Sequence, residues 1–269
     1  SVALGIINTT VRAGLDAASV LTGATKLTMG ATATDATTTE AEGGAAGGTS
    51  VSLLGVVAIT ISNVATSASV LAGNALSTLG DITGTAAQTA TAVTSAKGST
   101  TAGAGATLAA ALSFALTSAN HVVDASLSRN VTSGGSVTMA ADGTSTTSTT
   151  ATASSAGATG GASSGGKDTT GKDTKEKGDQ QLGFASATSS TASGTGAKDT
   201  STPAAKNEDG ATVSVAAAIA LNLVTSTTTA LIAPAVVVVA TGPVSLKTRN
   251  NTDAAAVADG SASNGSSVT

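Results

Sequence analysis

Large apolar residues lie along this chain in short blocks with a period of two. In residues 51–61 the odd positions read Val, Leu, Gly, Val, Ile, Ile, and the even positions read Ser, Leu, Val, Ala, Thr. Residues 213–223 show the same alternation of larger and smaller side chains. A period of two is the side-chain period of a β-strand. The pattern predicts strands that are buried on both faces, with the small-residue face packed more tightly.

A helix is the competing interpretation for the Ala-rich blocks, because Ala is the best helix former. The block at 51–61 carries Val56, Val57, Ile59 and Ile61, which are β-branched and disfavour a helix. If the blocks share one structure, that structure is a strand.

The blocks recur with a fixed spacing. Residues 2–8 align with 57–63 at a shift of 55, residues 112–118 lie another 55 further on, and residues 219–225 form a fourth copy 107 beyond the third. A second short apolar motif follows each block, at residues 26–29, 81–84, 136–139 and 243–246. Two landmarks that recur in the same order predict a repeat protein.

Repeats of this kind predict an all-β fold, a repetitive β-solenoid similar to a parallel β-helix, with about four repeats of 55 residues. Within each repeat we expect shorter strands after the first long one, as at 68–71, 232–240 and 244–248, and two or three coils per period. A repeated antiparallel β-sandwich is the alternative architecture.

The longer third interval indicates an insertion. Residues 151–209 contain few large apolar residues and repeat Lys-Asp-Thr three times. The predicted organisation is therefore repeats 1–3 in residues 1–150, with the first copy truncated at its start, a low-complexity charged loop in 151–209, and repeat 4 in 210–269.

Composition narrows the possible functions. The chain has two Phe, no Tyr, Trp or Cys, one His, and a formal net charge of −4. It therefore lacks the means for thiol catalysis, Cys/His zinc binding, aromatic stacking on bases or sugars, and clustered phosphate neutralisation. We expect no enzyme, no cofactor, no metal site and no nucleic-acid partner.

Single residues offer little chemistry. His121 is the only imidazole, and we expect it to be a half-exposed strand or turn residue rather than part of a Ser-His-Asp site with Asp124. Five carboxylates are expected to be isolated in loops of small residues: Glu40, Glu42, Asp142, Asp253 and Asp259.

No apolar run is long enough to predict a transmembrane segment. The chain begins Ser-Val-Ala-Leu, without an initiator Met or a signal-peptide pattern, which suggests an internal or processed piece of a larger protein.

Two segments resemble the β-strand repeats of large bacterial surface proteins, the filamentous adhesins and haemagglutinin-like passengers. They are residues 211–230, an Ala/Val run that ends in Asn-Leu-Val and a Thr run, and residues 134–140, Gly-Gly-Ser-Val-Thr-Met-Ala. The resemblance covers all but the insertion. It implies an extracellular or cell-surface location and an elongated β-solenoid or related fibre.

The chain ends suggest how such a fibre would join. The second long strand starts six residues before Val57, whereas the first copy starts at Val2, so its opening half is missing. Residues 267–269 resemble the start of such a strand. We therefore expect contacts between subunits at Val2, Leu4, Ile6, Val268 and Thr269.

The sequence thus predicts a non-enzymatic structural segment of an extracellular bacterial β-fibre, whose partner is itself, either as a homopolymer or as the continuation of a longer chain. The alternative is an adhesin stalk or passenger that presents residues 151–209 to a receptor or to host or matrix glycans.

Overall fold

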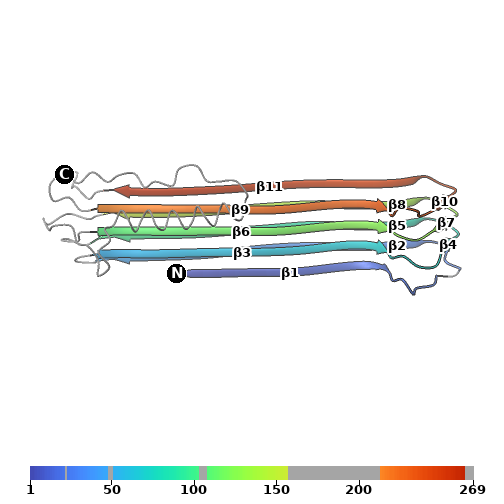
Figure 1. The fold of residues 1–269 in the computed structure, drawn as a ribbon, viewed down its shortest axis with the longest axis horizontal. Coiled ribbons are helices and arrows are strands. Elements are labelled where there is room, and N and C mark those ends of the chain that lie inside the picture. The colour runs from blue at the N-terminus through green and yellow to red at the C-terminus, as the bar shows by residue number, and fades with distance from the viewer. Residues whose placement is uncertain (22, 48–50, 103–107, 157–212, 264–269) are drawn as a thin grey trace.

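A computed structural model describes residues 1–21, 23–47, 51–102, 108–156 and 213–263. The described chain is built from long β-strands that lie side by side along the longest axis of the molecule (Figure 1). The strands are β1 (Val2–Leu15), β2 (Leu27–Ala46), β3 (Val51–Val70), β4 (Leu76–Thr78), β5 (Ile82–Thr101), β6 (Leu108–Leu127), β7 (Val131–Ser133), β8 (Val137–Ala156), β9 (Val213–Ile232), β10 (Val238–Ala240) and β11 (Val244–Ser263).

These strands form three parallel sheets. The first sheet has the order β1-β3-β6-β9 and the second has the order β11-β8-β5-β2. A small sheet, β10-β7-β4, closes one end of the space between them. All the pairings between the strands are parallel. The prediction of a β-solenoid is therefore confirmed, and the antiparallel sandwich is excluded.

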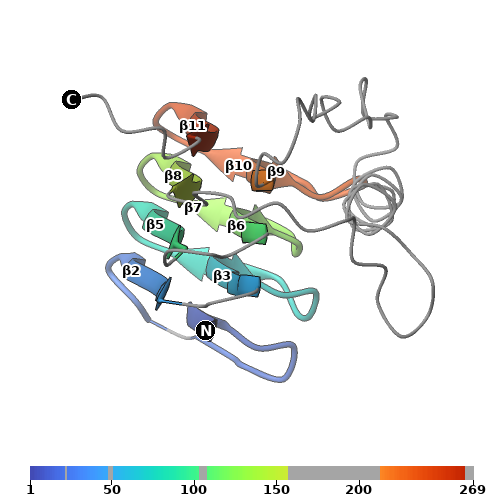
Figure 2. The same cartoon turned by 90° about the vertical axis from the view of Figure 1, so that its left-hand side faces the viewer.

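Each coil consists of one strand from each long sheet, running in opposite directions. In the second, third and fourth coils a short strand, β4, β7 or β10, lies at the turn between them, whereas the described residues of the first coil have only an isolated bridge from Ala24 to Thr78 there. Figure 2 shows the coils stacked from β1 and β2 at one end to β9 and β11 at the other. The register pairs Val2 with Val57 at an offset of 55, so one 55-residue period makes a single coil. The expectation of two or three coils per period was wrong, because each coil uses strands of up to 20 residues.

The second sheet follows the spacing of the second motif. Leu27 pairs with Ile82, Ile82 pairs with Val137, and Val137 pairs with Val244. In the first sheet, however, Val57 pairs with Phe114, two residues beyond the Leu112 that the sequence alignment matched to it. The connection from β5 to β6 has six residues, whereas the one from β2 to β3 has four, and this accounts for the two-residue difference. A shift of two preserves which face each side chain occupies.

The prediction of shorter strands after the first long one is confirmed only in part: β4, β7 and β10 have three residues each, but the next strand of each coil has 20. Residues 68–70 are the end of β3, and residues 244–248 are the start of the 20-residue β11. Within 232–240, Ile232 ends β9 and Val238–Ala240 forms β10. Large apolar residues are rare in the second sheet, where Ala, Thr and Ser alternate, so hydrophobicity alone marks only the beginning of each strand.

Small side chains fill most of the space between the two long sheets. Ala58, Ala96, Ala115 and Ala151 are fully buried there. At the turn end, where the short strands add a third wall, the interior holds larger side chains. Its buried cluster includes Val70, Ile82, Leu127, Val137 and Met139.

The face of the first sheet that carries the larger residues points outward. In β3, Val56, Ala58 and Thr60 are buried inside, whereas Val57 and Ile59 lie on the outer surface and are half-buried. The expectation that both faces of this strand are buried was therefore wrong within the described structure. The narrow gap between the sheets admits the small-residue face, and this selects which face turns inward.

The first six residues of the predicted insertion, 151–156, belong to a strand. Residues 151–156 form the end of β8 and pair with both β5 and β11. The remainder, residues 157–209, lies outside the described residues.

Candidate functional site

His121 lies in the interior on β6, with only 1% of its surface exposed. Its Nε2 is 3.1 Å from the Ser62 hydroxyl on β3, and its Nδ1 is 2.7 Å from the Ser145 hydroxyl on β8. The expectation of a half-exposed histidine was wrong. An inward position on a central strand, together with two hydroxyl partners, lets the neutral ring be buried with both nitrogens hydrogen-bonded.

The interior lowers the pKa of His121, because removal from water disfavours the charged ring; Asp35 partly opposes this effect. Asp124, by contrast, is on the outward face of β6, and its carboxylate accepts a hydrogen bond from Ser126 at 2.7 Å. His121 and Asp124 therefore project to opposite sides of the sheet, and this geometry does not bring them together as a catalytic pair.

The five carboxylates expected in loops are instead on strands. Glu40 and Glu42 belong to β2, Asp142 to β8, and Asp253 and Asp259 to β11. Their registers place them all on the outer face of the second sheet. Among the residues that the structure describes, no three His, Cys, Asp or Glu side chains gather where they could hold a metal ion.

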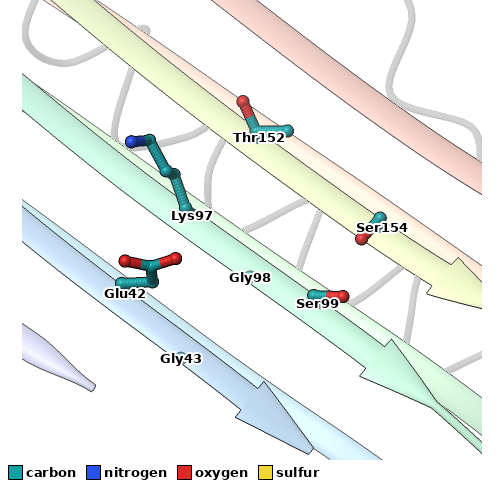
Figure 3. A pocket seen from close by; sticks show the side chains of 7 residues that line it. All are labelled: Glu42, Gly43, Lys97, Gly98, Ser99, Thr152 and Ser154. Atoms are coloured by element: carbon teal, nitrogen blue, oxygen red, sulfur yellow. The ribbon is translucent and has the colours of Figure 1, made fainter.

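Opposite charges meet on that face. Arg249 lies 3.3 Å from Asp142 on the neighbouring strand, and Glu42 is the direct cross-strand partner of Lys97. Glu42 and Lys97 line a shallow depression of about 300 Å³ whose other lining residues are Gly, Ser and Thr. Figure 3 shows the side chains of these residues on the neighbouring strands. Small side chains on a flat sheet give a ligand little to enclose it, so we assign no binding role to this depression.

The two ends of the stack differ from the rest of the surface because, in the described structure, their strands are paired on one side only. β1 and β2 are the edge strands at the N-terminal end, and β9 and β11 are those at the C-terminal end (Figure 2). Three of the predicted contact residues, Val2, Leu4 and Ile6, lie on the outward face of β1 and are 77%, 61% and 55% exposed. The other two, Val268 and Thr269, lie outside the described residues.

The first strand is shorter than its neighbours, as the sequence indicated. β1 has 14 residues and β3 has 20, and their pairing begins at Val2 and Val57. The Ser1 amino group donates a hydrogen bond to Gly55 O at 2.9 Å, and Val57 N donates to Ser1 O. Residues 51–56 thus extend beyond β1 along the edge of the sheet.

The C-terminal end exposes residues of core type that sequence reasoning missed. Val244 and Leu246 on β11 are 49% and 48% exposed, whereas their register partners Val137 and Met139 are fully buried. Both residues belong to the second repeated motif, at 243–246. Its alignment with the apolar residues at 136–139 could have identified them as core positions. Their exposure follows from their place in the last described coil.

The described residues form no helix that is long and apolar enough to cross a membrane. Comparisons with protein families, curated proteins and solved structures found no match to this chain. Inferences about function therefore depend on the geometry of the coils and their ends.

Proposed function

We propose that this chain is a non-enzymatic structural segment of an extracellular bacterial β-fibre, and that it assembles by stacking further coils on its ends. The observation that carries the proposal is the C-terminal end of the stack, where Val244 and Leu246 are half exposed although their equivalents in inner coils are buried. Solenoid proteins that remain soluble as separate molecules cover their terminal coils with polar caps. An end with exposed core positions favours the addition of another coil.

The strand edges support the same assembly. Edge strands carry unpaired N–H and C=O groups that can pair with another strand. The register of successive coils can be extended by one step, which places Ile219 of one copy beside Val2 of the next and Val244 beside Leu27. The next coil would come from a second copy or from the continuation of a longer chain.

The proposed location rests on the resemblance of residues 211–230 and 134–140 to bacterial surface repeats. We propose no catalytic role because of the side chains that the described residues present. The outer face of the second sheet carries ion-paired charges and hydroxyl groups, and His121 is buried between Ser62 and Ser145. A structural role needs only the parallel ladders and the close fit of small side chains.

Electron microscopy of the native material tests this proposal. We expect filaments whose long axis lies perpendicular to the strands, with an axial rise of about 4.8 Å per coil. Discrete rods of uniform length that do not join at high concentration would contradict end-to-end assembly.

A point variant makes the test specific to the C-terminal end. Leu246→Asp places a charge where the next coil would stack, and we expect it to abolish elongation while the separate molecule stays folded, because Leu246 is half exposed there. Val257→Asp is the matched control, since Val257 is also exposed on β11 but points to the outer face. Equal elongation by both variants would contradict the proposed joint.

A further inference from the structure

The outer face of the first sheet carries a continuous apolar surface across four strands. It consists of the outward-facing positions within residues 2–6, 51–61, 108–118 and 213–223, which we name the outer patch. The strand registers align these positions in rows, such as Val57, Phe114 and Ile219.

The outer patch contains no charged residue, and Ser118 is its single polar side chain. It ends where Asn8, Asn63 and Asn120 form a row, in which Asn63 Nδ2 donates to Asn8 Oδ1 at 2.8 Å. Beyond that row the same face becomes polar. The apolar character therefore belongs to one half of the sheet and is not a general property of its surface.

The size of the patch suits a protein interface. With strands about 4.8 Å apart and about 3.3 Å per residue, one segment of five residues and three of 11 cover about 600 Å². This area approaches the roughly 800 Å² that each partner of a stable complex buries, and it lies at the upper end of the apolar patches that monomeric proteins leave in water. At the margin of the patch, Leu4 and Leu53 are 61% and 65% exposed.

We infer that the outer patch is a face-to-face interface with a second copy of this chain. An uncharged sheet face is complementary to itself, and two such faces pack at about 10 Å with interdigitating side chains. The pairing is isologous, so it closes a dimer through a two-fold axis and does not by itself make a chain of molecules. It joins copies side by side, in a direction different from the stacking of coils.

Sedimentation equilibrium on the full chain carrying Leu246→Asp tests the inference with the C-terminal joint blocked. We expect a dimer at about 10 µM. The double variant Leu53→Lys/Ile59→Lys introduces two charges into the patch, and we expect it to weaken dimerisation more than about tenfold. Thr89→Lys, on the outer face of the second sheet, is the matched control and should leave the dimer intact. Circular dichroism checks that each variant keeps its β-structure.

A monomer at about 100 µM, or a dimer that the patch variants do not weaken, would overturn the inference. A monomer that also fails to bind an apolar dye at the patch would show that another segment of the same chain covers this face. If Leu246→Asp still forms filaments, the end-to-end joint is placed wrongly, yet the mass per length of those filaments tests the pairing separately. Side-by-side pairing predicts twice the mass per length of a single stack, and the patch variants should halve it.

Discussion

His121 and Arg129 are buried polar residues that form hydrogen bonds to other coils. His121 on β6 lies between Ser62 of β3, in the preceding coil, and Ser145 of β8, in its own coil. Arg129, in the turn after β6, donates to Leu71 O at 2.7 Å, to Ser19 O at 3.0 Å and to Asp16 O at 2.7 Å. These contacts connect successive coils through side chains, in addition to the backbone ladders.

We predict that the protein loses stability as the pH falls below 6.5, the ordinary pKa of a histidine side chain. Because the pKa of the folded residue is lowered from 6.5, the unfolded chain takes up the proton first. Stability is therefore complete above that pH and declines below it, by at most about 1.4 kcal/mol per pH unit for this one group. Urea denaturation from pH 7.5 to pH 5 measures the decline.

His121→Gln retains hydrogen-bonding groups but does not titrate, so its stability should vary less over this range. Asp35 is the acidic group that acts on the ring, and it favours the protonated form. An equal pH dependence in the wild type and in His121→Gln would show that other groups control it.

For Arg129 we predict that substitution by Met lowers the free energy of unfolding by about 2–4 kcal/mol, because three carbonyls lose a charged donor. Arg12→Met is the control. Arg12 is exposed and forms a surface ion pair with Asp16, and such pairs contribute at most about 1 kcal/mol. A similar small loss in both variants, measured by urea denaturation, would contradict the role assigned to Arg129.

At the scale of the strands, the narrow space between the two long sheets governs which residues are tolerated. Ala58, Ala96 and Ala115 fill it without exposed surface. A Cβ on Gly98 would lie 2.8 Å from Ser113 Oγ, closer than Cβ atoms come in proteins. The alternation of small and larger residues thus sets the separation of the sheets as well as the orientation of each strand.

We predict that Ala115→Leu destabilises the fold by about 1–3 kcal/mol, because the added volume forces the sheets apart. Ala87→Leu adds the same side chain on the outer face of β5, where it projects into solvent, and should change stability by less than about 0.5 kcal/mol. Thermal unfolding of the two variants gives the comparison. A smaller effect at Ala115 would mean that the interior can expand.

At the scale of the whole molecule, the stack has two kinds of coil. The strands β3, β5, β6 and β8 are paired on both sides, whereas β1, β2, β9 and β11 have one paired side in the described structure. If further coils add to the ends, the edge strands become equivalent to the inner ones.

Amide hydrogen exchange tests this equivalence. In separate molecules carrying Leu246→Asp, we expect inner strands to be protected at every position and β9 and β11 at alternate positions, because a strand directs its N–H groups to its two neighbours in turn. In assembled wild-type filaments, we expect β9 and β11 to become protected throughout. Unchanged exchange at these strands on assembly would indicate that the copies join elsewhere.

The sequence by itself determined the strand period, the all-β class and the offset of 55 that aligns the starts of the second-sheet strands. The landmarks at 26–29, 81–84 and 136–139 coincide with the observed registers because apolar residues at the start of each strand meet in the widest part of the core. The pairing of β1 with β3 begins at Val2 and Val57, six residues after β3 starts, and this could also be read from the alignment because it depends only on counting residues.

Tertiary structure decided what depends on the distance between the sheets. Periodicity distinguishes two faces of a strand but does not say which one is inside; here the gap admits Ala58 and excludes Ile59. The same distance places His121 between hydroxyls that lie 59 and 24 residues away in sequence. The exposure of Val244 and Leu246 depends on which coil comes last, and the outer patch exists because four registers align the larger residues on the face that the core cannot accommodate.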